Sequence, residues 1–328
     1  MQQKLLEAAL RFQKQEPWLA IEDYVAFAVK DPNSDELGYA AILGHGGKPP
    51  GLTLYRGQEG IEFFQQLEDG EIAPDFDDEI VTENSLRLEF LASGKNLTPS
   101  FRAFLPNYVP ATLDAPETEW LTFALDCACD YVAAMRADSE LAKERYYDAY
   151  LTYFGRKPTG FDAQWTAVDY PLAPVGSDLP VNELALRKLQ SLPVSNDGAW
   201  EAGVIYNRAE IVTEGARPWY RRMAVIAHKQ TGHIFKAESL HPDRDAGLTL
   251  REFLLEVVEK TKLIPLELHV STDTLWETLK PVTDGLQLRL RMKRFLPALA
   301  EIREGLLAGK GLIESPTPEP LRPISELH

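Results

Sequence analysis

Two histidines on either side of a predicted turn could bind a metal ion. His228 ends one predicted strand and His233 begins the next, with the four-residue turn Lys229–Gly232 between them. On paired strands the two side chains would lie nearly opposite one another, within reach of a shared ion. A transition-metal site would need a third ligand, for which His241 and Asp243 are the candidates. Because such pairs are more often ordinary surface histidines, we assign the chain no metal and no other cofactor.

A group of basic residues could bind an anion. Its members are Arg217, Arg221, Arg222, Arg289, Arg291, Lys293 and Arg294. Arg289 and Arg291 alternate with leucines, so they share one face of a predicted strand. Together with Tyr220 and Arg222 they predict a local surface for an anion or a nucleic acid on an otherwise acidic protein. The alternative is a solvated face on which the arginines neutralise nearby glutamates.

Three further segments are better explained by structure than by chemistry. The glycine-rich run Gly44–Gly51 leads into a strand, whereas phosphate loops lead into a helix N-terminus, so we predict a wide turn, with His45 as a ligand the alternative. Cys127 and Cys129 would point to opposite sides of a helix and not share a metal. The acidic run Asp75–Glu79 lacks the spacing of a calcium loop. Neither a nucleophile elbow nor a Walker-type phosphate loop occurs.

The elements that must position these residues are clearest between residues 200 and 309. Hydrophobic alternation predicts five strands, at Val204–Tyr206, Met223–His228, His233–Glu238, Leu266–Val270 and Leu286–Met292. Three helices are predicted, the first capped by Thr249, the second beginning at Asp273, and the third lined by Phe295, Leu299, Ile302 and Leu306. The resulting order, β-β-β-α-β-α-β-α, predicts a mixed sheet with helices packed on it, and hence an α+β fold.

This order resembles the ribonuclease H-like fold, and the local sequence is similar to the retroviral integrase and transposase branch of that fold. The resemblance rests on Trp200 at the first strand, on Thr231 and Gly232 in the hairpin turn, and on the segment Pro265–Asp273 at the fourth strand. Two-metal nucleases of this class hold two cations with carboxylates from the first strand, the end of the fourth strand and a late helix.

The acids in the corresponding positions of this chain are Glu201, Asp273 and Glu301. Glu201 lies at the edge of the first strand and not in its middle, and Asp273 occupies a position typical of a helix N-cap. Thr274 follows where the integrase pattern has glycine. We therefore predict a degenerate ribonuclease H-like domain with no assigned catalytic residue, and these three acids are the candidates if the domain is an enzyme.

The first half of the chain is predicted to be a hairpin-rich α+β unit. Patterns predict a helix over residues 2–15 and strands at Tyr24–Val29, Gly38–Leu43, Leu52–Tyr55 and Leu86–Leu91. Asp114 and Glu117 form a capping box that begins a long helix. A second helix is predicted over Glu140–Phe154, and an irregular segment over residues 155–180. Because three strands, a short helix at Gly60–Leu67, a strand and the long helix follow in order, this half could share the plan of the second.

The length of 328 residues favours two domains. A turn-forming stretch at Ser195–Gly198 places the predicted boundary between an N-terminal domain of residues 1–197 and a C-terminal domain of residues 198–311. Residues 312–328 are rich in proline and polar residues and are predicted to be a loosely attached tail.

The charge balance disfavours several partners. The chain has 34 Lys and Arg against 50 Asp and Glu, which gives a net charge of −16. Such a surface repels nucleic-acid phosphates and anionic membranes. The sequence has no apolar run of eighteen residues, no signal peptide and no disulfide framework, so we predict a cytoplasmic protein.

The whole chain also resembles an uncharacterised bacterial family built from two domains of unknown function. The segments that carry this resemblance are Leu37–Gly44, Leu54–Gly60, Phe101–Pro110, Trp120–Leu125 and the half that begins at Trp200. The resemblance implies no activity. We therefore expect a non-catalytic binding or interaction protein with an unidentified protein partner. The alternative is a divalent-metal-dependent nuclease or phosphotransfer enzyme of the ribonuclease H-like class.

Overall fold

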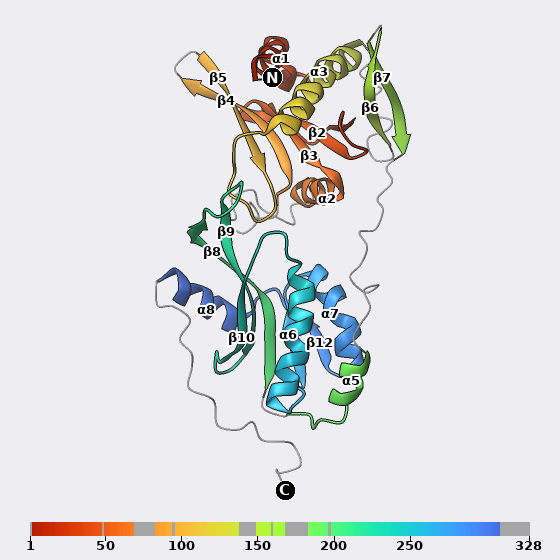
Figure 1. Ribbon diagram of the computed structural model, residues 1–328. Helices are drawn as coiled ribbons and strands as arrows, with labels where there is room; N and C mark the ends of the chain where they lie inside the picture. The colour runs from red at the N-terminus through yellow and green to blue at the C-terminus, as the bar shows by residue number, and fades with distance from the viewer. Residues whose placement is uncertain are drawn as a thin grey trace. The chain divides into compact units, whose positions relative to one another are not determined.

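The computed structural model separates into two compact units, Met1–Pro171 and Leu172–His328. It describes residues 2–47, 49–68, 83–93, 96–137, 149–158, 160–167, 183–195 and 198–308. Each unit combines helices with one β-sheet, which confirms the predicted α+β class with two domains (Figure 1). The division falls earlier than the predicted boundary at residue 197, because Leu186 and Leu189 are buried in the core of the second unit. None of the described helices combines the length and apolar character that a membrane span requires.

The first unit is built on a seven-stranded sheet with the order β5-β4-β3-β2-β1-β6-β7. Its strands are β1 (Ala26–Lys30), β2 (Leu37–Leu43), β3 (Gly51–Arg56), β4 (Ser85–Ser93), β5 (Asn96–Phe104), β6 (Ala149–Lys157) and β7 (Gly160–Ala167). Neighbouring strands are antiparallel except β1 and β6, which are parallel. The four strands predicted for this half, now β1 to β4, are confirmed.

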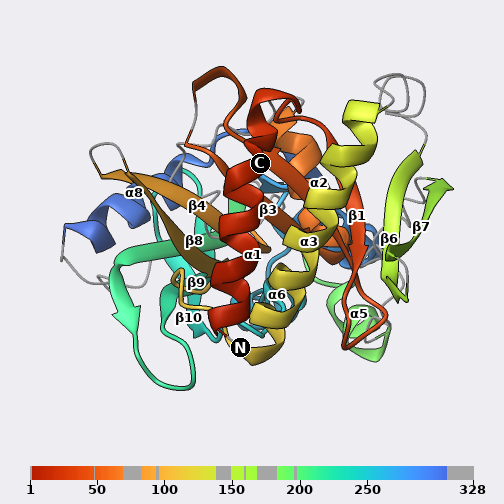
Figure 2. The ribbon, with the colours of Figure 1, turned by 90° about the horizontal axis from the view of Figure 1, so that it is seen from above.

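Three α-helices cover this sheet in the described part of the unit. They are α1 (Gln2–Gln15), α2 (Gly57–Glu68) and α3 (Ala115–Ala137), with short 3₁₀ turns η1 (Pro17–Leu19) and η2 (His45–Gly47). Figure 2 shows α1 and α3 side by side on one face, where they form the main core with residues such as Phe27 and Leu54. Helix α2 packs on the other face against Tyr55 and Ala41. The predicted capping box is present: the Asp114 amide donates to Glu117 Oε2 at 2.9 Å, and the Glu117 amide donates to Asp114 Oδ1 at 3.0 Å.

Three predictions for this half need correction. The helix predicted over Glu140–Phe154 is wrong from residue 149 on, because these Tyr- and Thr-containing residues form β6, as their β propensity favours. The segment 155–180, predicted to be irregular, begins within the β6–β7 hairpin. The rest of that segment, residues 168–180, lies outside the described residues. So do residues 140–148, the acidic run Asp75–Glu79 and the tail 312–328. A plan shared with the second half would require the fourth strand to lie beside the first and parallel to it. Strand β4 instead pairs antiparallel with β3.

The second unit contains a five-stranded mixed sheet with the order β10-β9-β8-β11-β12. The strands are β8 (Ala199–Val212), β9 (Trp219–His228), β10 (Ile234–Leu240), β11 (Glu267–Val270) and β12 (Arg289–Met292). The helices are α5 (Glu183–Leu189), α6 (Ala246–Thr261), α7 (Asp273–Gly285) and α8 (Pro297–Leu307). Strands β8, β9 and β10 are antiparallel, whereas β8, β11 and β12 are parallel. From β8 onward, the elements follow one another along the chain in the order β-β-β-α-β-α-β-α.

The two faces of this sheet are covered by different helices. Helices α5, α6 and α7 bury one side of the sheet, which includes Trp200, Ala202 and Ile226, and we call it the α6 face. Helix α8 packs on the opposite side, against Ile205 and Val225, and we call it the α8 face. Adjacent residues of one strand thus enter different cores, as the alternation of side chains along a strand requires.

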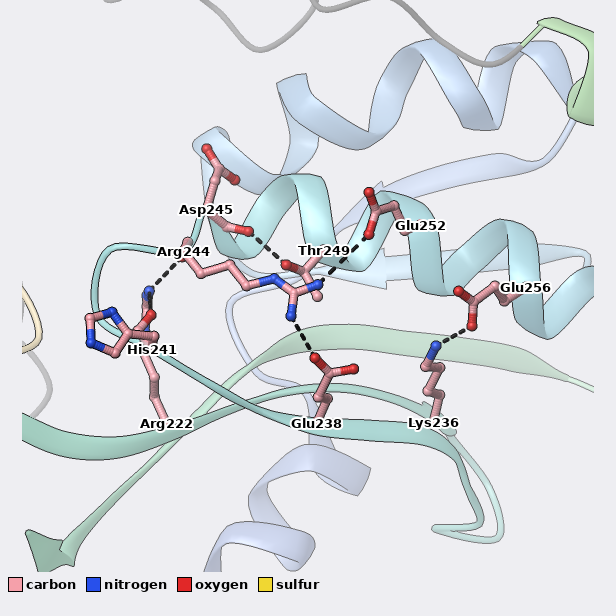
Figure 3. Close-up of polar contacts among 9 residues, drawn as sticks. All are labelled: Arg222, Lys236, Glu238, His241, Arg244, Asp245, Thr249, Glu252 and Glu256. Carbon is pink, nitrogen blue, oxygen red and sulfur yellow. Dashed lines mark hydrogen bonds and ion pairs between the residues drawn. The ribbon is translucent and has the colours of Figure 1, made fainter. Parts of the chain in front are cut away.

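The capping residues of the helices in this unit differ from the predicted ones. Asp245, not Thr249, caps α6 by accepting a hydrogen bond from the Leu248 amide at 2.8 Å. Thr249 lies in the first turn, where its hydroxyl donates to the Asp245 carbonyl oxygen (Figure 3). Thr272 caps α7 instead of Asp273. Phe295 was predicted to line the last helix, but it precedes α8 and is 68% exposed.

Candidate functional site

Five ionisable residues from three neighbouring parallel strands lie in a row on the α8 face. They are Glu201 of β8, Glu267 and His269 of β11, and Arg289 and Arg291 of β12. In the strand register His269 pairs with both Glu201 and Arg291, and Glu267 pairs with Arg289. Register partners project to the same face of a sheet, and the residues that alternate with them belong to the core of the α6 face. We call these five residues the polar row.

Glu201 is fully buried and caps α8 from the sheet. Its Oε2 accepts hydrogen bonds from the amides of Ala298 at 2.9 Å and Leu299 at 3.3 Å. The residue at the N-cap of α8, Leu296, has no side-chain oxygen to offer these amides. Burial raises the pKa of Glu201, while the two amide hydrogen bonds act in the opposite direction. Its second oxygen, Oε1, is buried and has no hydrogen-bond partner among the described residues.

Glu267 connects the histidine and an arginine of the polar row. Its Oε2 lies 3.2 Å from Nε2 of His269, which is only 3% exposed. Its Oε1 accepts a hydrogen bond from Nε of Arg291 at 3.3 Å. The hydrogen bond with His269 is the largest cause that lowers the pKa of Glu267, with Arg291 contributing in the same direction. Glu267 therefore stays ionised and holds both neighbours in place.

The polar row becomes more exposed toward the edge of the sheet. Glu201 and His269 are buried, Glu267 is half-buried, and Arg289 and Arg291 are exposed. Cations at the edge can bind an anionic group, since a guanidinium matches a carboxylate or phosphate. The buried carboxylate at the other end is already engaged by α8.

The three acids considered as nuclease ligands do not come together. Glu201 is enclosed beneath α8 on the α8 face. Asp273 is exposed at the first residue of α7, which packs on the α6 face. Glu301 is exposed on α8, with its carboxylate beside Gly232 of the β9–β10 turn. Within the described ranges, no group of three His, Cys, Asp or Glu side chains is placed to hold a metal ion.

The middle of β8 also lacks room for a metal-binding side chain on the α8 face. The residue there is Gly203, and a Cβ built on it would lie 2.8 Å from Cδ1 of Leu299. Helix α8 packs against β8 and β9 and fills this position with apolar atoms. A carboxylate at this position would displace Leu299.

The predicted histidine pair forms, but its third ligands lie elsewhere. The rings of His228 and His233 both meet Phe235 edge-on, at centroid distances of 6.2 Å and 5.1 Å. Nδ1 of His228 lies 2.9 Å from the Thr231 hydroxyl, and burial lowers the pKa of His233. His241 and Asp243 follow the far end of β10, whose seven residues span about 20 Å. The predicted set of metal ligands is therefore not assembled.

Arg222 and Tyr220 do not share a surface with the arginines of the polar row. Arg222 is buried, and its Nη2 donates to three carbonyl oxygens, those of His241, Pro242 and Arg244, at 2.9, 2.7 and 2.6 Å. Figure 3 shows Arg222 beneath the loop that leads into α6, and these hydrogen bonds hold the loop in place. Tyr220 is also buried. Because Arg222 lies on the α6 face, the prediction of one surface formed with Arg289 and Arg291 is wrong.

The other segments singled out from the sequence have internal contacts. The amides of Gly44 and His45 donate to Oδ1 of Asp23 at 2.9 and 2.8 Å, so the glycine-rich turn binds a carboxylate of its own chain. Cys127 is buried within α3. Cys129 is half-buried, and burial with the neighbouring Asp126 raises its pKa to about 11, so it is a poor nucleophile.

A groove of about 500 Å³ separates α5 from α6 in the second unit. Its apolar lining includes Leu184, which is 69% exposed, Leu189 and Leu255. Charged residues line it as well, among them Lys188 and Glu259. The groove is a second candidate binding surface, away from the polar row, which lies on the other face of the sheet.

The two residues missed by sequence reasoning are Glu267 and His269. They alternate with Leu266, Leu268 and Val270, so their position on one face of a strand was visible in the sequence. Their neighbours across the sheet were not visible, because the parallel pairing of β8, β11 and β12 joins residues far apart in the chain.

Comparison with known proteins gives two matches to domains without an assigned function. Residues 3–93, in the first unit, match the model of a domain of unknown function, DUF7309. Residues 185–307, in the second unit, match another domain of unknown function, DUF6930. One match thus falls in each unit. No curated protein matches the chain.

Among solved structures, part of the chain is similar to a chain in the "CryoEM structure of simian T-cell lymphotropic virus intasome in complex with PP2A regulatory subunit B56 gamma". The match has 12% sequence identity and a TM-score of 0.27, and it covers 36% of this chain and 44% of that chain. This chain thus spans less than half of the similar one, and at this TM-score the likeness supports no conclusion about function.

Proposed function

We propose that the chain is a binding or interaction protein without catalytic activity, whose second unit has a degenerate ribonuclease H-like plan. The sheet order supports the plan: three antiparallel strands, β10, β9 and β8, are followed by two strands parallel to β8. The bacterial two-domain family and the cytoplasmic location predicted from the sequence belong to the same proposal.

The position of α8 over β8 is the observation that carries the proposal. Two-metal chemistry needs free carboxylates around two cations about 4 Å apart. Glu201, the candidate acid on β8, is enclosed and accepts hydrogen bonds from two amides of α8. Leu299 fills the space over Gly203. A metal ion at this face would require α8 to move away and Glu201 to give up its hydrogen bonds.

The cationic edge of the polar row supports a protein partner. Arg289 and Arg291 are exposed on a chain whose net charge is −16, so a locally positive edge stands out from the rest of the surface. The same net charge disfavours nucleic acid at long range. A short acidic segment of another protein carries less charge than a nucleic-acid strand, so this repulsion is weaker for it, while the exposed arginines still attract it.

Calorimetric titration with Mg²⁺ and Mn²⁺ tests the absence of metal chemistry. We expect no heat that depends on Asp273, so the wild type and Asp273→Ala should give superimposable titrations. Plasmid cleavage in Mn²⁺ should stay at the buffer level for both proteins. Asp284→Ala is the matched control, because Asp284 is also an exposed aspartate of α7 and is not one of the three candidate acids.

Metal-dependent cleavage by the wild type that is lost in Asp273→Ala would overturn the proposal. That result would favour the alternative, a divalent-metal-dependent nuclease or phosphotransfer enzyme using Asp273, Glu201 and Glu301.

A further inference from the structure

Strand β12 is an edge of the five-stranded sheet. On its inner side the Arg289 amide donates to the Leu266 carbonyl oxygen at 3.4 Å, and the Lys293 amide donates to that of Val270 at 2.8 Å. Because the amides of alternate residues point the same way in a ladder, those of Leu290 and Met292 point to the outer side. No described residue forms a hydrogen bond with either outer amide.

The side chains of β12 alternate between two chemistries. Arg289 and Arg291 project to the α8 face. Leu290, which packs against the core of the α6 face, and Met292, which is 37% exposed, project to the other side. A strand added to this edge would place its own alternate residues beside these two rows. The rows therefore select a segment in which acidic and apolar side chains alternate.

The charge at this edge exceeds what the described residues neutralise. Glu267 pairs with Arg291. Arg289, Lys293 and Arg294 are exposed and form no ion pair within the described part of the chain. Phe295 follows directly and is 68% exposed, so the edge ends in an apolar side chain available for contact.

Protection against aggregation accounts for only part of the composition of this edge. Basic residues on an edge strand can prevent pairing with other chains, but that role gives no reason for an exposed Phe295 and a part-exposed Met292 at the same edge. The α5–α6 groove is the competing binding surface, but nothing in the described residues shows what would fill it.

We propose that the outer edge of β12 binds an extended segment of a partner protein by β-strand addition, and that acidic and apolar side chains alternate in this segment. Its backbone pairs with the free groups of Leu290 and Met292, its acids contact Arg289 and Arg291, and its apolar residues contact Met292. This inference rests on the proposed function as a binding protein and names the class of partner.

A labelled peptide tests the backbone pairing. The probe is an eight-residue peptide of alternating glutamate and valine with an N-terminal fluorescein, and binding to the full chain is followed by fluorescence anisotropy. Met292→Pro removes an outward amide and leaves the inner ladder intact, as proline is tolerated on edge strands. We expect it to weaken binding at least about tenfold. The matched control Met292→Ala keeps the amide and should change affinity by less than about threefold.

A second pair of variants tests the charges. Arg289→Ala with Arg291→Ala should weaken binding and reduce its dependence on salt, since fewer ionic contacts remain. Arg187→Ala is the control, because Arg187 is exposed on α5 and pairs with Glu183. Circular dichroism and thermal unfolding must show that every variant is folded.

Three outcomes would overturn the inference. Equal binding by Met292→Pro and Met292→Ala would mean ionic attraction without strand addition. Equal binding of a peptide with four glutamates followed by four valines would remove the need for alternation. Tighter binding of a twelve-residue oligothymidylate, lost on arginine substitution, would identify a nucleic-acid partner. None of these results depends on the metal titration and cleavage assay, which decide the proposed function separately.

Discussion

The two faces of the five-stranded sheet are made by the same strands but differ in chemistry. On the α6 face, three helices bury a continuous apolar core that includes Trp200 and Ala202. On the α8 face, one helix buries a smaller apolar cluster, and the polar row begins beside it with Glu201. Successive residues of β8 thus alternate between a large apolar core and a site with a buried carboxylate.

This difference separates what stabilises the unit from what is available for function. Burying an ionisable group costs free energy unless hydrogen bonds compensate, so stability alone would favour apolar residues on both faces. Among the described residues, only one carboxylate oxygen of Glu201 accepts hydrogen bonds that compensate for its burial. The α8 face is therefore where we place the function, and the α6 face is where we place most of the stability.

Replacement of Trp200 should have the largest effect on stability. Trp200 is 1% exposed and contacts Phe235 at a ring distance of 4.5 Å. Trp200→Ala should lower the free energy of unfolding by about 3–5 kcal/mol, because it removes a large side chain and leaves a cavity. Urea denaturation followed by far-ultraviolet circular dichroism measures the loss.

Leu299→Ala on the α8 face is the matched comparison. Leu299 is 7% exposed and is covered by a smaller cluster. Its loss should lie near about 2 kcal/mol, the low end for a buried leucine. An equal or larger loss for Leu299 would contradict the view that the α6 face carries most of the stability.

The sequence was sufficient to predict most of the α6 face. Leu250, Phe253, Leu254, Val257 and Val258 recur at helical spacing, and all are buried in α6. Periodicity of this kind involves only residues close together in the sequence, so it can be recognised without knowledge of the tertiary structure. The start of the helix was less predictable, because Asp245 and Thr249 are both good N-cap residues. The loop held by Arg222 places Asp245, and not Thr249, at the N-cap.

The polar row and the fate of Arg222 depend on contacts between distant segments. Glu201 and His269 are neighbours only because β8 and β11 pair in one particular parallel register. Arg221 and Arg222 look alike in the sequence, but Arg221 pairs with Glu210 in a part-exposed site, whereas Arg222 is buried under loop carbonyls. The predicted shared plan of the two halves failed for a similar reason: β6, not β4, lies parallel to β1.

Substitution of Glu201 tests the cap that the sheet supplies to α8. Glu201→Ala removes the acceptor for the amides of Ala298 and Leu299, and buried donors without partners cost about 1–3 kcal/mol. Glu201→Gln keeps a carbonyl oxygen of similar position, so at neutral pH it should be as stable as the wild type or more stable. A Gln variant as unstable as the Ala variant would show that the charge itself is required.

The pH dependence of these variants has a defined sign. The pKa of Glu201 is raised in the folded state, so the folded state binds the proton more tightly than the unfolded state. The wild type should therefore lose stability relative to Glu201→Gln as the pH rises from the ordinary glutamate pKa through the raised one. The pKa of Glu267 is lowered, so its contribution should be present above the ordinary pKa and lost as the pH falls. Both effects are measured by the urea midpoints of wild type, Glu201→Gln and Glu267→Gln between pH 3 and 8. The difference between wild type and Glu201→Gln should fall with rising pH, and that between wild type and Glu267→Gln should rise. Differences that change in the same direction would contradict the two pKa shifts.

The smallest expected effect concerns the contact between Gly203 and Leu299. A Cβ on Gly203 would approach Leu299 Cδ1 to 2.8 Å, and the leucine can give way in part, so Gly203→Ala should cost about 1 kcal/mol. In the background of Leu299→Ala the clash is absent, and the same change should be neutral or slightly stabilising, since alanine is better than glycine in a strand. A double-mutant cycle measured by urea denaturation gives the coupling between the two positions. If the coupling is zero, α8 does not close the space over the middle of β8, and the main support for a non-catalytic second unit is lost.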